Sequence, residues 1–276
     1  MASDIPPDSS AQEQSSSYIL PAADTDFLLR DEMRAMRFAL EYAKAEVLLR
    51  DWGIRSTVIV FGSARVASPE QLEQAQATMQ SAEEIAAVER MGRQLAWYQG
   101  AREFARIVSL EGGALAPHHR WRDNVITTGG GPGIMEAANR GAHEAGAPTI
   151  GMNITLPHEQ HPNPYITPEL TFRFHYFAMR KMHLAMRANA LIAFPGGFGT
   201  LDELFEVLTL RQTNKSPDIP IVLYDRNYWS KISGFEALCE EGMISRANLE
   251  LFEFADSPEE CWACLTRRGL QAAPAS

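Results

Sequence analysis

The stretch Pro195-Gly-Gly-Phe-Gly-Thr-Leu-Asp-Glu203 lies between two apolar segments of different character. The short run Ala190–Phe194 before it is typical of a buried parallel strand, and the run Leu204–Leu210 after it is typical of an amphipathic helix. Glycines let the backbone approach a ligand closely, and the N–H groups of a first helical turn point toward an anion. The stretch therefore predicts a phosphate site. Glu203, one turn into the helix, indicates chemistry beside that phosphate.

The same pattern of a strand followed by a helix recurs along most of the chain. Apolar runs predict strands at Ser56–Phe61, Asn124–Thr128, Pro148–Ile154, Leu170–Phe177, Ala190–Phe194, Pro220–Tyr224 and Glu250–Phe254. Helical patterns fall at about 69–89, 97–110, 134–145, 178–187, 204–210 and 229–241, and after Pro258. This alternation predicts an α/β fold, a Rossmann-like doubly wound parallel sheet of about seven strands in a single domain with an N-terminal helical extension.

Composition divides the chain into three parts. Residues 1–25 are rich in Ser, Pro, Asp and Gln, and we expect them to form a disordered tail. Residues 26–53 carry apolar side chains at helical spacing and predict an N-terminal helix, which either covers the chain's own core or pairs with a partner subunit. Residues 54–270 are the predicted nucleotide-binding domain, with an exposed helical insertion at about 69–90.

Charge and hydropathy limit the classes of function. The chain has 276 residues, of which 45% are hydrophobic, and a formal net charge of −10. The negative charge argues against a nucleic-acid groove, and no apolar run is long enough to span a bilayer or to form the core of a signal peptide. We therefore expect a cytoplasmic protein that binds neither nucleic acid nor membrane and takes a small anionic ligand.

Cysteine and histidine spacing predicts neither redox chemistry nor a metal site. Cys261-Trp-Ala-Cys264 has the spacing of a redox pair. It falls on the expected C-terminal helix rather than after a strand, so we expect two ordinary helix residues. The histidines form no zinc-binding pattern. The sequence therefore predicts no metal and no cofactor.

Three glycine-containing turns follow predicted strands: Gly62–Arg65, Gly129–Gly133 and Pro195–Thr200. In a doubly wound sheet, ligands bind at the carboxyl ends of the strands, where the strand order reverses. The turn at Gly131 lacks the third glycine of the dinucleotide fingerprint, because Glu136 stands in its place, and the chain has no GxxxxGK[ST] motif. Dinucleotide and Walker-type triphosphate sites are thus excluded, and two short turns fit one monophosphate with its sugar.

Three motifs resemble those of the LONELY GUY (LOG) family: Gly129-Gly-Gly-Pro-Gly-Ile-Met-Glu136, Met179-Arg-Lys181 and Pro195–Glu203. The resemblance runs from about Thr57 to Leu238. It implies a Rossmann-like enzyme that hydrolyses the N-glycosidic bond of a nucleoside 5′-monophosphate to the free base and ribose 5-phosphate. It also implies a homodimer or a multiple of dimers. The chain resembles the longer bacterial members, so we expect AMP or another purine monophosphate, such as cytokinin-type AMP, as the substrate.

The resemblance also implies roles for particular side chains. Arg180 corresponds to the family's catalytic arginine and Glu203 to its catalytic glutamate. The other residues expected to contact the substrate and its phosphate are Ser63, Gly130, Gly131, Gly133, Glu136, Lys181, Gly196, Gly197, Gly199 and Thr200. Breaking the N-glycosidic bond passes through an oxocarbenium-like sugar, which a nearby carboxylate stabilises while it activates a water.

Other interpretations fit the same residues. Thr200 and Glu203 have the spacing of a capping box, and Glu136 would complement the dipole of its own helix. The alternative function is a non-catalytic carrier that binds a nucleotide or molybdenum cofactor on the same fold, although simple binding needs no carboxylate next to an anion. The label of lysine decarboxylase, often given to this family, is rejected because Lys181, the lysine near the predicted site, has no recognisable pyridoxal phosphate context.

Overall fold

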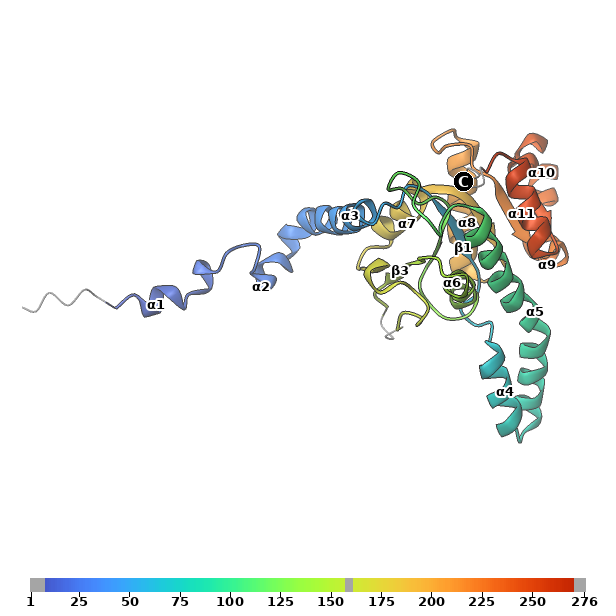
Figure 1. Cartoon of the computed structure of the whole chain (residues 1–276), viewed down its shortest axis with the longest axis horizontal. Coiled ribbons are helices and arrows are strands. Elements are labelled where there is room, and N and C mark those ends of the chain that lie inside the picture. The colour runs from blue at the N-terminus through green and yellow to red at the C-terminus, as the bar shows by residue number, and fades with distance from the viewer. Residues whose placement is uncertain (1–7, 157–160, 271–276) are drawn as a thin grey trace, which may run out of the picture. The chain divides into compact units, whose positions relative to one another are not determined.

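A computed structural model describes residues 8–156 and 161–270 of the chain. Within these residues the chain forms one sheet of seven strands in the order β4-β3-β2-β1-β5-β6-β7, and each neighbouring pair is parallel (Figure 1). The strands are β1 (Thr57–Phe61), β2 (Val125–Thr128), β3 (Ile150–Ile154), β4 (Thr171–Phe174), β5 (Ala188–Ala193), β6 (Ile221–Tyr224) and β7 (Glu253–Ala255). The predicted α/β fold with a parallel sheet of about seven strands is confirmed.

Helices cover both faces of this sheet. The helices that follow β1 are α4 (Pro69–Thr78), α5 (Ala82–Glu111), α6 (Ile134–Glu144), α7 (Phe177–Met186), α8 (Phe198–Gln212), α9 (Arg226–Ile232), α10 (Phe235–Glu240) and α11 (Pro258–Arg267), with short 3₁₀ turns η3 (Pro168–Leu170) and η4 (Arg246–Leu251). Side chains of β1 alternate between the two faces, as expected of a strand that is buried on both sides. Val58 and Val60 join the core under α5, α6 and α11, whereas Ile59 and Phe61 join the core under α7, α8 and α9.

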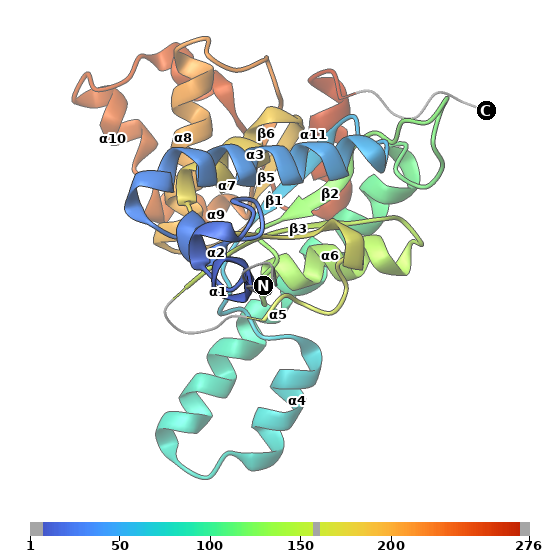
Figure 2. The same ribbon diagram turned by 90° about the vertical axis from the view of Figure 1, so that its left-hand side faces the viewer.

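Two predicted helix boundaries are wrong. The segments expected as separate helices at 69–89 and 97–110 are instead the short α4 and the 30-residue α5, because Ser81 forms a capping box with Glu84 and begins a new helix that continues to Glu111. The helix expected at 229–241 is divided into α9 and α10 by Gly234, which has a left-handed φ of +55°. In both views, α4 and the first half of α5 form a hairpin that extends away from the sheet (Figures 1 and 2).

The chain divides into two compact units, residues up to Lys44 and residues from Ala45 onward. The described part of the first unit holds α1 (Ser10–Glu13), η1 (Ser16–Tyr18), α2 (Thr25–Leu28), η2 (Asp31–Met33) and the first part of α3 (Arg34–Asp51). No described residue before Ala45 is buried, so the described hydrophobic core belongs to the second unit. The predicted domain boundaries stay a prediction. Among the described residues, no helix combines the length and the apolar character needed to cross a membrane.

Candidate active site

The turns after β1 and β5 lie side by side, because the strand order of the sheet reverses between these two strands. The backbone N–H of Ser63, in the β1 turn, donates to the carbonyl of Pro195 in the β5 turn at 3.0 Å. The N–H of Ile134, at the start of α6, donates to the carbonyl of Ser63 at 3.1 Å. Gly133 has a φ of +71°, and an added Cβ would stand 2.3 Å from that same carbonyl oxygen. The three predicted turns therefore meet at the carboxyl ends of the strands.

A buried asparagine holds the glycine turn after β2. Asn163 donates its backbone N–H to the carbonyl of Gly130 at 2.9 Å and its side-chain amide to the carbonyl of Gly131 at 3.0 Å. The same amide also reaches Oδ1 of Asn139, in α6, at 2.9 Å, and that oxygen accepts the hydroxyl of Thr128 at 2.7 Å. The sequence predicts only a loop around Asn163, since hydrogen bonds between segments far apart in the chain leave no local pattern.

The turn after β5 leads into α8 with the geometry of an anion site. The helix begins at Phe198, after Gly197, and no side chain caps its first turn. An added Cβ at Gly196 would stand 2.1 Å from Oγ1 of Thr200, whereas Gly197 and Gly199 border open space. The first N–H groups of α8 are thus accessible to a ligand oxygen. The capping-box interpretation of Thr200 is wrong, because Thr200 lies inside the helix rather than before it.

Arg180 of α7 and Glu203 of α8 form an ion pair beside these turns. The guanidinium donates from Nη2 to Oε1 of Glu203, and the two side chains are 12% and 13% exposed. An added Cβ at Gly129 would lie 3.5 Å from Nη1 of Arg180, so the pair borders the second glycine turn. The ring of Phe177 lies under the guanidinium, 5.5 Å from its carbon to the ring centroid. Two residues 23 positions apart in the sequence are thus brought into contact.

Burial changes the acid strength of Glu203. Removal from water raises the pKa of this carboxyl group to about 7, although the positive charges of Arg180 and Lys181 favour its ionised form and oppose the change. A carboxylate with a pKa near neutrality is suited to accept a proton from water. The arrangement therefore combines accessible helix N–H groups, a buried guanidinium and a carboxyl group of raised pKa at the carboxyl ends of the strands.

The chain is similar in sequence to known proteins. A family model described as "Possible lysine decarboxylase" matches residues 135–265. The probable cytokinin riboside 5′-monophosphate phosphoribohydrolase LOG4 of Oryza sativa subsp. japonica is 29% identical over 146 residues, which are 52% of this chain and 62% of that protein. The cytokinin riboside 5′-monophosphate phosphoribohydrolase LOG3 of Arabidopsis thaliana is 30% identical over 143 residues, 50% of this chain and 64% of that protein. The chain is thus similar to LOG proteins over about half of its length.

The aligned region spans less than two thirds of the length of these LOG proteins. Among solved structures, the molybdenum cofactor binding protein from the phototrophic bacterium Rippkaea orientalis is 20% identical, with a TM-score of 0.48, and the match covers 77% of this chain and 97% of that one. The Moco carrier protein from Chlamydomonas reinhardtii is 20% identical, with a TM-score of 0.44, and the match covers 78% and 98%. At this level of similarity, neither likeness bears on the ligand of this chain.

Lys181, in the LOG-like motif 179–181, pairs with carboxylates on α8. Its ammonium lies 2.7 Å from Oδ2 of Asp202 and 3.0 Å from Oε2 of Glu206. Burial by itself would lower the pKa of Lys181, but the hydrogen bonds to these two carboxylates outweigh it and raise the pKa. Lys181 thus ties α7 to α8 next to the Arg180–Glu203 pair. Its part in phosphate binding stays a prediction.

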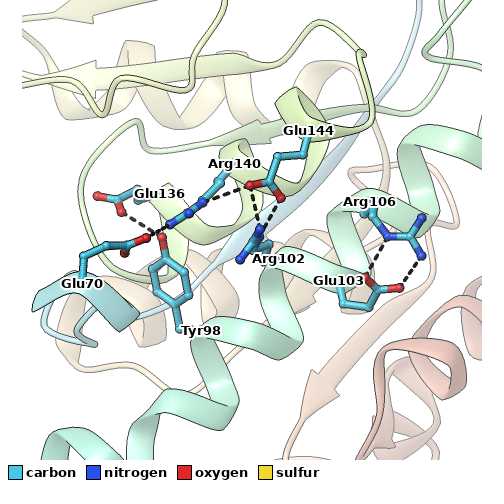
Figure 3. Close-up of polar contacts among 8 residues, drawn as sticks. All are labelled: Glu70, Tyr98, Arg102, Glu103, Arg106, Glu136, Arg140 and Glu144. Atoms are coloured by element: carbon cyan, nitrogen blue, oxygen red, sulfur yellow. Dashed lines mark hydrogen bonds and ion pairs between the residues drawn. The ribbon is translucent and has the colours of Figure 1, made fainter. Parts of the chain in front are cut away.

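Glu136, the acid of the LOG-like glycine motif, lies in the first turn of α6 and is bound by a tyrosine of α5. The hydroxyl of Tyr98 donates to Oε1 of Glu136 at 2.8 Å (Figure 3). The sequence does not point to Tyr98, because it falls in a helical pattern whose partners on α6 lie 38 or more residues away. The ribose-side role of Glu136 stays a prediction.

The remaining polar candidates do not form a further site. Cys261 and Cys264 lie on α11 as two buried free thiols, and burial raises the pKa of both. A raised thiol pKa lowers the reactive thiolate fraction, as expected of ordinary helix residues. Across residues 8–156 and 161–270, no group of three or more His, Cys, Asp or Glu residues is placed to hold a metal ion.

Proposed function

We propose that this protein hydrolyses the N-glycosidic bond of a purine nucleoside 5′-monophosphate, AMP or a cytokinin-type AMP, to the free base and ribose 5-phosphate. The observation that carries the proposal is the buried Arg180–Glu203 pair beside two glycine turns. Relatives named as cytokinin riboside 5′-monophosphate phosphoribohydrolases support the same class of reaction.

The proposal assigns the phosphate to the turn before α8. Its oxygens would accept hydrogen bonds from the N–H groups of the first turn of α8, with the Thr200 hydroxyl as a further donor. The other groups in this part of the proposed site are Gly196, Gly197, Gly199 and Lys181. Gly197 and Gly199 border open space, so a ligand oxygen can approach the backbone there. The ribose would then lie toward the second turn, against Ser63, Gly130, Gly131, Gly133 and Glu136.

Glu203 is the proposed general base and charge stabiliser. As the bond from C1′ to the base nitrogen breaks, its electron pair leaves with the base, and positive charge develops on the sugar. A carboxylate next to C1′ stabilises that charge. A water then forms the new bond to C1′ and gives one proton to Glu203. The leaving base nitrogen takes up one proton from solvent, and Glu203 returns its proton to solvent, so that one water is consumed for each bond broken.

Arg180 is the proposed positioning group for the anionic substrate. Its guanidinium already contacts Glu203, and a bound nucleotide would share it through charge-assisted hydrogen bonds. Its Nε atom is buried, and the described part of the chain offers it no hydrogen-bond partner. A ligand oxygen at that atom would satisfy a buried donor, which is a favourable change.

Base release separates this proposal from a non-catalytic carrier. Purified protein is incubated with AMP and with isopentenyl-AMP, and free base is measured by chromatography. Glu203→Gln is expected to lower kcat by roughly 10²- to 10⁴-fold, the usual contribution of a general base. Glu236→Gln, which changes an exposed carboxylate on α10, serves as the matched control. Intact nucleotide retained for hours without base release, or full turnover by Glu203→Gln, would contradict the proposal.

The homodimer and the cytoplasmic location are part of the same proposal. The support for the homodimer is the resemblance to the LOG family rather than a measured assembly, and the location stays the expectation drawn from the sequence. The chain mass is 30.7 kDa, so light scattering at several concentrations distinguishes a monomer from a dimer directly.

A further inference from the structure

Glu136 is held by a hydrogen-bond network that reaches it from two other helices (Figure 3). Tyr98 of α5 donates its hydroxyl to Oε1 of Glu136 at 2.8 Å. The guanidinium of Arg140, one turn further along α6, lies beside the same hydroxyl (Figure 3). Since Tyr98 is 0% exposed, bulk water does not compete with Glu136 for this hydroxyl, and the contact fixes the direction of the O–H bond.

Arg140 is itself held in place by carboxylates on α4 and α6. Its Nη1 lies 2.8 Å from Glu70 of α4, and its Nε lies 3.1 Å from Glu144 of α6. Glu144 also accepts two hydrogen bonds from Arg102 of α5, at 2.6 and 2.7 Å. These pairs connect three helices around Tyr98 (Figure 3), and several charges in one network hold a geometry better than an isolated surface pair does.

The network leaves one oxygen of Glu136 available to a ligand. Oε1 is occupied by Tyr98, and in the described part of the chain Oε2 makes no hydrogen bond. Burial raises the pKa of the Tyr98 hydroxyl, and the charge of Glu136 raises it further, so the hydroxyl stays protonated and remains a donor. The two hydroxyls of a ribose are donors that an ionised carboxylate oxygen accepts well.

We propose that Tyr98 is a positioning residue for ribose recognition. By holding Oε1, it directs Oε2 of Glu136 toward the ribose hydroxyls and makes the site prefer ribonucleotides to 2′-deoxyribonucleotides. This inference rests on the proposed function, which assigns the ribose contact to Glu136. A sugar without the 2′-hydroxyl leaves an oriented acceptor unpaired, and a site built to hydrogen-bond a hydroxyl discriminates strongly against the analogue that lacks it. A freely rotating carboxylate would instead turn to water.

The test compares AMP and dAMP with four variants of the full-length protein. They are Tyr98→Phe, Glu136→Gln, the double variant and Tyr224→Phe. Tyr224 is the matched control, since it is a buried tyrosine of the same core whose hydroxyl faces Gly100 of α5. Tyr98→Phe keeps the ring and its packing and removes only the donor. Melting temperatures show whether each variant is folded.

Tyr98→Phe is expected to raise the KM for AMP about ten-fold with kcat within about two-fold, because a hydrogen bond to a charged group is lost outside the reacting centre. The preference for AMP over dAMP should fall by a similar factor. In the Glu136→Gln background, the same change should have little further effect, since both residues act through one contact. Tyr224→Phe should leave KM and the preference unchanged.

Other outcomes would overturn the inference. If Tyr98→Phe lowers only the melting temperature, or if its effect on KM adds fully to that of Glu136→Gln, Tyr98 has a merely structural role. Titration with ribose 5-phosphate separates this failure from failure of the proposed function. Wild-type protein that releases no base but binds ribose 5-phosphate more tightly than Tyr98→Phe refutes the reaction and supports the inference. Wild-type protein that does not bind ribose 5-phosphate refutes both.

Discussion

A single buried carboxyl group gives the proposed reaction a specific pH dependence. Burial raises the pKa of Glu203 from an ordinary carboxyl value of 4.5 to about 7. A general base must be unprotonated, so activity should be present above pH 7 and be lost as the pH falls below it. We expect log kcat for AMP hydrolysis to fall by about one unit per pH unit on the acid side, with an apparent pKa near 7. Turnover rates measured from pH 5 to 9 check this.

The charged residues beside Glu203 allow a test of whether the acid limb of the pH profile belongs to this residue. Lys181 favours the ionised form of Glu203 and lowers its pKa, whereas Asp202 raises it. Replacing Lys181 by Met should therefore move the acid limb to higher pH, and Asp202→Asn should move it to lower pH. Glu203→Gln should remove the acid limb from the residual activity, whereas an ionisation of the nucleotide phosphate would leave the limb in place. An acid limb near pH 4.5 in the unaltered protein would contradict the assignment to Glu203.

At the scale of whole elements, the strands were predictable because each is a short apolar run. The helix boundaries were less so. The sequence predicts a break between one helix that ends at residue 89 and another that begins at residue 97. Between them only Gly92 disfavours a helix, and it is tolerated because it borders open space. The helix α5 therefore continues through these residues. The capping-box interpretation would begin α8 after Thr200. The helix begins earlier, at Phe198, because the turn after β5 ends at Gly197.

Contacts between distant segments account for the other features that the sequence does not reveal. The motifs 129–136, 179–181 and 195–203 indicated Arg180 and Glu203 as site residues, and the structure brings these two into contact. Tyr98 and Asn163 carry no such signal. Each acts through hydrogen bonds to residues more than 20 positions away, and a single sequence does not encode such pairs in any local pattern.

Asn163 gives the connection between β3 and β4 a measurable part in stability. Its side-chain amide is buried and bonds to Gly131 and to Asn139, so Asn163→Ala removes both contacts and leaves a buried carbonyl with one partner fewer. We expect a loss of about 2–3 kcal/mol in the free energy of unfolding, measured by urea denaturation. Glu169→Ala, an exposed change in the same connection, should cost less than about 0.5 kcal/mol.

Asn163→Ala should also affect the kinetics of AMP hydrolysis more than Glu169→Ala does. Loss of Asn163 frees the turn that the proposed function assigns to the ribose, so the KM for AMP should rise more than kcat falls. Equal free energies of unfolding for Asn163→Ala and Glu169→Ala would show that the hydrogen bond from Asn163 to Gly131 does not stabilise the fold.

At the scale of the whole chain, the hydrophobic core of the second unit explains which part of the sequence is needed for stability. The described buried residues lie between Ala45 and Leu270. Within this unit, the last turns of α3 contribute Ala45 and Leu49 to the core under α7, and Glu46 pairs with Arg187 at 2.6 Å. Removing the start of the chain should therefore change the stability little, whereas removing the end of α3 should lower it strongly.

Two deletions test this division. A chain that begins at Arg34 keeps all of α3, and its melting temperature should stay within about 2 °C of that of the full chain, because no described residue before Arg34 is buried. A chain that begins at Gly53 loses Leu49 and leaves Arg187 without its carboxylate. Removing one buried leucine alone costs about 2–5 kcal/mol, so its melting temperature should fall by 10 °C or more, on the order expected for a domain of this size. Scanning calorimetry measures both. Equal losses in the two chains would mean that the first 33 residues stabilise the domain as much as the buried end of α3 does.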